Sequence, residues 1–136
     1  MGLFIIIVKQ TIMKKFFTLI LLFCFSIAFT NVTAQNSKPV VGEWKYKVAQ
    51  APYGYDTGVI SLKEVEKKLT GEIIFDSGYK VKLQSVDFKN DTLRVGVYVD
   101  SEYVNILSRV KGKKLEGTVD SSMGKMDLTA EKLEKK

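Results

Sequence analysis

The side chains of this sequence that could do chemistry are carboxylates and hydroxyls, because its 136 residues include no histidine and a single cysteine, Cys24. Histidine is the commonest general base, and histidine and cysteine supply most zinc ligands. The segment Asp87–Asp91 offers carboxylates for a cation, but it lacks the glycine and terminal glutamate of a calcium loop and is better interpreted as a solvated turn. Ser77, Ser101 and Ser121 have no nucleophile-elbow pattern around them. We therefore expect no enzyme activity, no metal site and no cofactor.

The segment Met13–Ala34 has the three parts of a secretory signal peptide. Two lysines directly follow Met13, an apolar run of about 14 residues spans Phe16–Phe29, and Val32-Thr33-Ala34 supplies the small residues that a signal peptidase reads. The sequence predicts cleavage after Ala34. The mature protein then begins at Gln35 and is periplasmic or secreted.

The residues before Met13 add a second short apolar run that a signal peptide does not need, so we interpret Met13 as the true start. The alternative is an uncleaved membrane anchor. Lys9 and the two lysines after Met13 argue against it, because they interrupt the apolar sequence before the roughly 20 residues of a membrane span are complete. A lipoprotein is less consistent still, since Cys24 follows Phe23 where a lipobox needs a small residue.

The charge of the mature chain does not indicate nucleic-acid binding. The whole sequence has 21 basic and 15 acidic residues, and removal of residues 1–34 takes away three lysines and no acid, which leaves 18 minus 15, or +3. Lysines are scattered among acids rather than clustered, as on an ordinary surface. No cysteine remains after cleavage, so one hydrophobic core must hold about 100 residues without disulfides.

From Gly42 onward, apolar residues alternate with polar ones, and turn residues recur every eight to twelve positions. This pattern is typical of antiparallel strands joined in a meander. The segment Glu64–Lys68 is the best local helix candidate, but a charged five-residue loop between strands explains it better. The apolar residues define eight strands, at Trp44–Val48, Ile60–Leu62, Leu69–Phe75, Tyr79–Leu83, Leu93–Val99, Val104–Val110, Leu115–Val119 and Met126–Leu128.

Two segments of the chain repeat one motif. Lys67–Ile73 (KKLTGEI) is echoed by Lys113–Val119 (KKLEGTV), and in each copy a second glycine follows the first after seven residues. Glycine inside a strand marks a bend or a close backbone approach, which a closing sheet requires. The alternative is that two hairpins merely share turn chemistry.

Eight short strands on about 95 residues are too few for a large sandwich, and an open sheet leaves two edges and an apolar face exposed. We therefore predict an all-β fold, an eight-stranded antiparallel up-and-down barrel. The domains expected are a signal peptide at 1–34, an N-terminal tail at 35–41 and the barrel at 42–133.

Three residues at the start of the first strand carry a family resemblance. Gly42-Glu43-Trp44 resembles the G-x-W motif of the calycin superfamily, which comprises the lipocalins, fatty-acid-binding proteins and avidins. The mature sequence is also similar to small exported lipocalin-like domains of Bacteroidetes, which share the two L-x-G hairpins and a terminal L-T-A-E-K-like strand. The resemblance implies that Trp44 closes the floor of the barrel and that Lys132 covers its ring. The chain departs from these families in its short length and in having no helical lid.

The resemblance and the residues together favour binding over catalysis. More than twenty apolar side chains face inward, which favours a filled interior over a hollow one, but a cavity for one small apolar ligand remains open. In a meander, the strand ends opposite Trp44 form the mouth, and Tyr53, Tyr55, Tyr79 and Met123 are the candidate ligand-binding residues there. The tyrosines could equally cap the barrel as core. The other function that we consider is a solid accessory module whose loops contact a protein or a glycan.

Overall fold

The structure, a computed structural model, describes residues 2–25 and 36–136, and the chain divides into two units, residues 1–34 and 35–136. In the first unit one helix, α1, spans Gly2–Phe25. Within the described ranges, no helix combines the length and the apolar character needed to cross a membrane. The predicted cleavage after Ala34 lies outside the described residues and stays a prediction.

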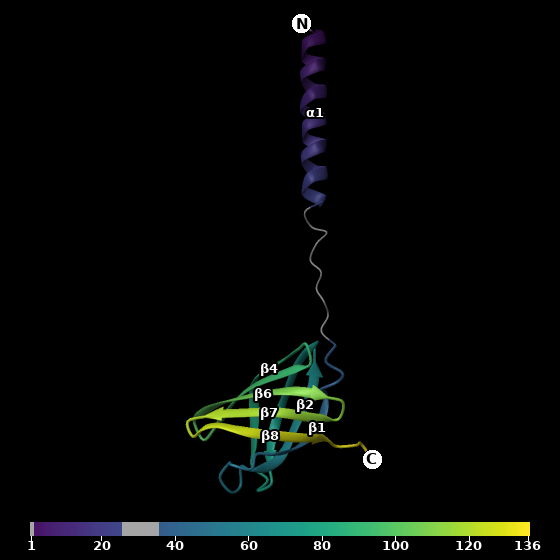
Figure 1. The fold of residues 1–136 in the computed structure, drawn as a ribbon. Helices are drawn as coiled ribbons and strands as arrows, with labels where there is room; N and C mark the ends of the chain where they lie inside the picture. Colours follow the sequence, from purple (N-terminus) through teal and green to yellow (C-terminus); the bar gives the residue numbers. More distant parts are fainter. Residues whose placement is uncertain (1, 26–35) are drawn as a thin grey trace. The chain divides into compact units, whose positions relative to one another are not determined.

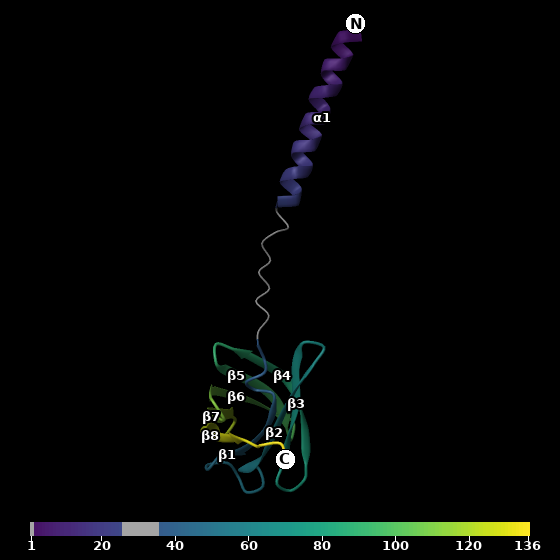
Figure 2. The ribbon, with the colours of Figure 1, turned by 90° about the vertical axis from the view of Figure 1, so that its right-hand side faces the viewer.

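The second unit is a closed barrel of antiparallel strands, as Figure 1 and Figure 2 show. Each strand pairs with the next along the chain, and β8 pairs with β1, so the sheet has no free edge. The predicted all-β, eight-stranded, lipocalin-like up-and-down barrel is confirmed. The strands are β1 Gly42–Lys47, β2 Thr57–Val65, β3 Lys68–Phe75, β4 Lys80–Lys89, β5 Thr92–Val99, β6 Glu102–Lys111, β7 Lys114–Ser121 and β8 Gly124–Lys132.

The alternation of the sequence decides which side chains face the interior. In β1, for example, Trp44 and Tyr46 are buried, whereas Lys45 and Lys47 are exposed. Successive side chains of a strand point to opposite faces, so inward positions recur at every second residue of a regular strand. Burial of one large apolar side chain stabilises a fold by about 1.5 to 3 kcal/mol, which explains how a core without disulfides holds this domain.

The barrel has two ends that the meander keeps distinct. One end is formed by the connections 48–56, 76–79, 100–101 and 122–123, and we call it the mouth. The other end is formed by the turns 66–67, 90–91 and 112–113, and we call it the floor. The floor also holds the N-terminal turn, in which Val40 is fully buried and its backbone amide donates a hydrogen bond of 3.0 Å to the carbonyl oxygen of Ser37. Consecutive antiparallel strands place alternate connections at the same end, so every odd-to-even connection lies at the mouth.

The predicted loop at Glu64–Lys68 is wrong. Glu64 and Val65 belong to β2, Lys68 begins β3, and the connection is a two-residue turn at Glu66 and Lys67. Both turn residues have positive φ, 51° and 63°, as in a type I′ hairpin. That turn twists with the strands, so the hairpin stays paired up to Val65 and Lys68 instead of opening into a loop.

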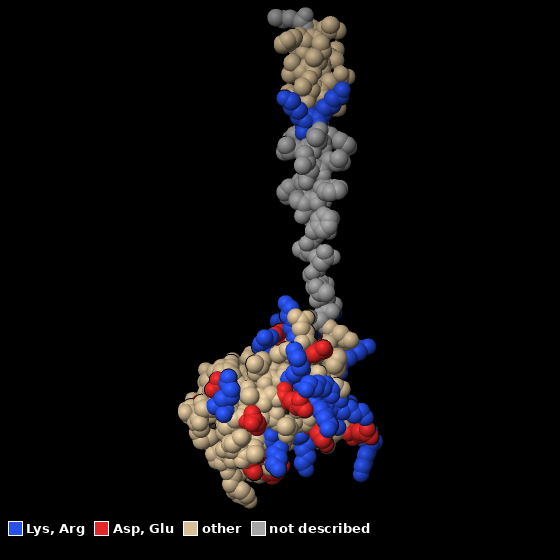
Figure 3. Space-filling model, in the orientation of Figure 1, with Lys and Arg blue, Asp and Glu red and all other residues tan. Residues whose placement is uncertain are grey.

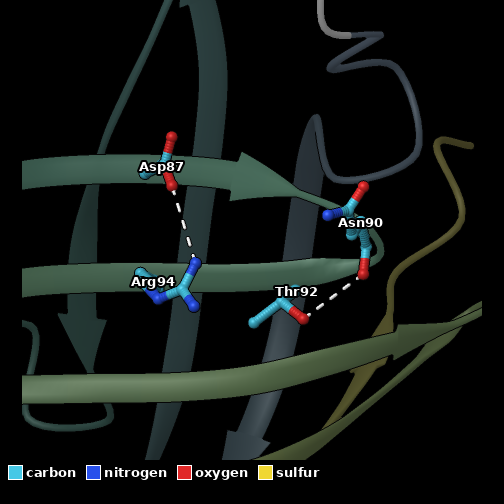
Figure 4. A network of polar contacts seen from close by, with 4 residues as sticks. All are labelled: Asp87, Asn90, Thr92 and Arg94. Atoms are coloured by element: carbon cyan, nitrogen blue, oxygen red, sulfur yellow. Dashed lines mark hydrogen bonds and ion pairs between the residues drawn. The ribbon is translucent and has the colours of Figure 1, made fainter.

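The segment Asp87–Asp91, considered above for cation binding, is a strand end and a floor turn (Figure 4). The carboxylate of Asp87 lies 3.8 Å from a guanidinium nitrogen of Arg94 on the neighbouring strand β5. The hydroxyl of Thr92 donates to the carbonyl of Asn90 at 3.3 Å. These contacts are those of an exposed hairpin.

The two copies of the repeat occupy equivalent places in the barrel. Gly71 lies in β3 opposite Leu62, and Gly117 lies in β7 opposite Ser108. A Cβ atom at either glycine would come within 2.0 Å of a backbone oxygen on the preceding strand. Both glycines therefore mark the close backbone approach that the repeat predicted.

One irregularity interrupts β4. Its register against β5 shifts between Leu83 and Ser85, which places Gln84 in a β-bulge. Before the bulge Val81 and Leu83 are buried, and after it Phe88 is buried, so the inward face changes from odd to even positions. An extra residue of this kind bends a strand, as closure of a small barrel requires.

Candidate functional site

The interior of the barrel is hollow at the mouth, where a cavity of about 180 Å³ lies among side chains of most strands. Its wall is apolar and includes Ile60, Ile73, Val97, Val104, Ile106 and Leu128. The sequence favoured an interior that side chains fill completely. The structure shows such filling in the floor half, whereas the mouth half contains the cavity. The alternation along the strands provides enough apolar side chains to fill the barrel. It does not determine whether those side chains reach one another at the centre of the barrel.

The floor is closed by Trp44, whose side chain is fully buried. Its indole nitrogen donates to the carbonyl oxygen of Val40 at 2.8 Å. The Nζ atom of Lys132, at the end of β8, lies 5.4 Å from the centroid of the Trp44 ring, and it also approaches the Pro39 carbonyl at 3.4 Å. A ligand can therefore enter the barrel only from the opposite end.

Tyr55 ties the long connection between β1 and β2 to the rest of the mouth. Its hydroxyl donates to the carboxylate of Asp100 in the β5–β6 turn, and its ring packs edge-on against Phe75 with centroids 5.1 Å apart. Its backbone carbonyl accepts a hydrogen bond of 3.1 Å from the hydroxyl of Tyr46. The bond to Asp100 raises the pKa of Tyr55, so this phenol stays protonated and remains a donor.

Tyr46 follows Trp44 on the interior face of β1, and its hydroxyl lies towards the mouth. Burial raises the pKa of Tyr46 well above its ordinary value, and the negative charges of Asp76 and Asp56 act in the same direction. The side chain therefore presents a neutral phenol to the cavity that it lines.

The rim of the cavity is acidic. Among the described residues that line it, the charged ones are Asp100 and Glu102, and neither lysine nor arginine contributes. Glu102 is half-buried and accepts a hydrogen bond from the backbone amide of Ser122, which lowers the pKa of its carboxyl group. Glu102 is therefore ionised at neutral pH. Ser121 contributes a further hydroxyl to the lining.

The four candidate residues named from the sequence all lie at the mouth but differ in their relation to the cavity. Tyr55 and Met123 line it. The ring of Tyr79 stacks on the ring of Phe75, with centroids 5.7 Å apart, but Tyr79 does not line the cavity. Tyr53 is 98% exposed at the tip of its loop and forms no part of the wall.

Asp100 lines the cavity but is not among the candidate residues named from the sequence. The sequence does not show whether a carboxylate at a strand end faces the interior of a barrel, because the direction of that side chain depends on the conformation of the turn. Here Asp100 has a φ of 48° and begins a tight turn that brings it over the cavity. Across the part of the chain that the structure describes, no three acidic or cysteine side chains lie close enough together to hold a metal ion.

No protein-family model matches the sequence, and no curated protein matches it significantly. Among solved structures, the crystal structure of the wild-type fluorescent protein UnaG aligns with a TM-score of 0.49 and 14% identity, over 72% of this chain and 100% of that chain. A point mutant of UnaG aligns with a TM-score of 0.49 and 15% identity, over 74% of this chain and 100% of that one.

Proposed function

We propose that this chain is an exported, non-enzymatic barrel protein that binds one small apolar molecule in the cavity at its mouth. The observation that carries the proposal is the cavity itself, with an apolar wall, in a barrel whose other end is sealed by Trp44. An empty apolar space forfeits packing contacts, which a ligand restores. The loss of packing contacts is therefore expected where a binding site needs the space.

The size of the cavity limits the ligand. Its volume of about 180 Å³ is close to that of an engineered protein cavity of about 150 Å³ that binds benzene, and well below the roughly 300 to 1,000 Å³ of typical drug-sized sites. We expect a molecule with one ring or a short branched chain. A long-chain fatty acid is too large to be enclosed.

The proposal of export rests on the Met13–Ala34 segment and on the absence of cysteine from the sequence after it. A domain without thiols folds in an oxidising compartment without side reactions. In that compartment a barrel of this kind would take up its ligand from the surrounding fluid.

The test of binding uses propylbenzene as a neutral ligand of matching size and titration calorimetry as the measurement. The wild-type domain, residues 35–136, is expected to bind it saturably. Val104→Phe, which fills the cavity, should abolish binding, whereas Val65→Phe makes the same change at a side chain that is 50% exposed near the floor and should not. Absence of binding by the wild type, or equal effects of the two variants, would contradict the proposal.

A second candidate function is that of an interaction module, which one feature of the outer face favours. Tyr98 on β5 and Tyr103 on β6 pack edge-to-face at 5.0 Å on the outside of the barrel, and Leu107, four residues further along the same face of β6, is 48% exposed. Exposed tyrosines are common contact residues. If a protein or glycan binds there, Tyr98→Ser with Tyr103→Ser should remove that binding and leave propylbenzene binding unchanged.

A further inference from the structure

The charge at the cavity rim points to the chemical class of the ligand. We propose that the cavity takes small apolar molecules that carry a protonated amine, and that it discriminates against molecules of the same size that carry a carboxylate. This inference rests on the proposed function, because it assigns the headgroup of the molecule that the cavity encloses.

The first observation is the direction of Glu102. In β6 the inward positions alternate through Ile106 and Val104 to Glu102, so the carboxylate stands directly above the apolar wall on the same interior face. An apolar molecule seated against Val104 and Ile106 therefore presents its outer end to Glu102. Asp100, two residues earlier, lines the same cavity from the turn.

The second observation is that both carboxylates retain an oxygen for a ligand. The bond from Tyr55 uses Oδ2 of Asp100, and the bond from Ser122 uses Oε1 of Glu102. An ionised carboxylate has two oxygens that accept hydrogen bonds, and an ammonium group has three donors. The rim can thus hold an ammonium group between two acids that are already oriented by the protein.

The third observation is the distribution of charge along the barrel. The connections and strand ends at the mouth carry more acids than lysines, namely Asp56, Asp76, Asp100, Glu102 and Asp120 against Lys47, Lys80 and Lys125. Arg109, Lys111, Lys113 and Lys114 lie around the floor turn between β6 and β7, where Lys111 pairs with Glu116 and Lys113 with Glu134. Figure 3 shows blue and red side chains together at the right of the barrel. The field at the mouth attracts cations and repels anions.

A carboxylate ligand has the opposite energetics. It would lose water on entering the apolar cavity and would meet two negative charges at the rim, with no lysine or arginine among the described lining residues to compensate. Among the lining side chains described, the uncharged donors are the hydroxyls of Tyr46, Tyr55 and Ser121, and the first two already donate to the Tyr55 carbonyl and to Asp100. Fatty acids are therefore disfavoured by charge as well as by size.

The experiment compares four probes of nearly equal size, 2-phenylethylamine, 2-phenylethanol, propylbenzene and phenylacetate, by titration calorimetry at pH 7 and low salt. We expect the amine to bind about three- to tenfold more tightly than the alcohol, because each partly exposed ion pair contributes modestly. Phenylacetate should bind most weakly. High salt should reduce the preference for the amine, since it screens the rim.

The decisive variant is Asp100→Asn with Glu102→Gln, which removes both charges and keeps the shapes and the hydrogen bonds to Tyr55 and Ser122. It should lose the preference for the amine, so that 2-phenylethylamine and 2-phenylethanol bind about equally tightly. The control is Asp87→Asn, because Asp87 is exposed on the outer face near the floor, where its contact with Arg94 is weak (Figure 4).

The outcomes separate the two proposals. Binding of propylbenzene without preference for the amine overturns the inference and leaves the proposed function intact. A preference for the amine that survives in the double variant, or that Asp87→Asn removes equally, also overturns it. Failure of all four probes to bind overturns the proposed function and the inference together.

Discussion

The ammonium group of Lys132 lies 5.4 Å from the ring centroid of Trp44 and joins the end of the last strand to the beginning of the first. Trp44 and Lys132 face each other directly across the β1–β8 seam that closes the barrel. That seam buries the ring completely while Lys132 stays half-exposed. The contact therefore combines a large apolar burial with a cation–π attraction at the rim of the floor.

We expect Trp44→Ala to lower the free energy of unfolding by about 3 to 5 kcal/mol, because it removes a large core side chain and leaves a cavity. Lys132→Met keeps most of the aliphatic stem and removes the charge, so it should cost only about 0.5 to 1 kcal/mol. Urea unfolding measures both. The matched control is Lys45→Met on the outer face of β1, and equal losses at Lys132 and Lys45 would show that the cation–π contact contributes nothing.

The repeated glycines and the alternation of apolar residues predicted the strand number and the closed topology, because side-chain period and turn spacing are local properties. Two details of the same strands were not predictable in this way. The turn at Glu66 and Lys67 has positive φ at residues that are not typical of it, so its charge suggested a loop. The bulge at Gln84 was visible only as a change of apolar parity between Leu83 and Phe88, which is easily read as noise.

Ser108 offers a test of core polarity. Its hydroxyl is buried in β6 opposite Gly117 and, among the described residues, has no hydrogen-bond partner. A buried hydroxyl without a partner costs free energy, so Ser108→Ala should raise the free energy of unfolding by about 1 kcal/mol. Ser85→Ala, at an exposed position of β4, should change it by less than about 0.5 kcal/mol. A destabilised Ser108→Ala protein would mean that the hydroxyl is bonded in solution, for example to water.

Glu102 should make the stability of the barrel depend on acid pH. The hydrogen bond from the Ser122 amide lowers the pKa of Glu102 below its ordinary value of 4.5, so the folded state favours the ionised form. The resulting stabilisation is fully present above that ordinary value and is lost as the pH falls through the lower pKa of the folded state. In thermal melts between pH 7 and 2.5, Glu102→Gln should show a shallower acid decline than wild type, and Asp87→Asn is the control for loss of one charge.

Processing is predicted from the sequence alone. Expressed in a Gram-negative host, the full chain should be cut after Ala34, and intact-mass measurement of the soluble product should match a chain that begins at Gln35. A version that starts with Met directly before Gln35 lacks the signal and should stay unprocessed in the cytoplasm. Recovery of the uncut chain from the membrane fraction would instead support the anchor alternative.

The candidate site was predictable in position but not in chemistry. Counting strands placed Tyr55 and Met123 at the end opposite Trp44, because a meander fixes which connections share an end. The cavity depends on side chains from many strands meeting on one axis, which no local pattern reports. The acidic rim depends on the turn at Asp100, whose backbone conformation brings the side chain over the cavity.

The bond between Tyr55 and Asp100 connects two mouth loops, and its removal should loosen the entrance. Tyr55→Phe keeps the ring against Phe75 and deletes only the donor. We expect dissociation of a bound probe such as 2-phenylethanol to become several-fold faster in a stopped-flow measurement, because the loop opens more often. Tyr53→Phe, at a fully exposed ring, is the matched control and should leave the rate unchanged.

The same bond predicts a dependence on alkaline pH. Since the Asp100 carboxylate raises the pKa of Tyr55, the folded state favours the protonated phenol. The stabilisation is present below the ordinary tyrosine value of 10.0 and is lost as the pH rises through the higher pKa of the folded state. Unfolding experiments between pH 8 and 11 should therefore show a smaller alkaline loss for Tyr55→Phe than for wild type. Some loss should remain, because burial also raises the pKa of Tyr46. Identical alkaline profiles of the two proteins would show that the Tyr55–Asp100 bond does not form in solution.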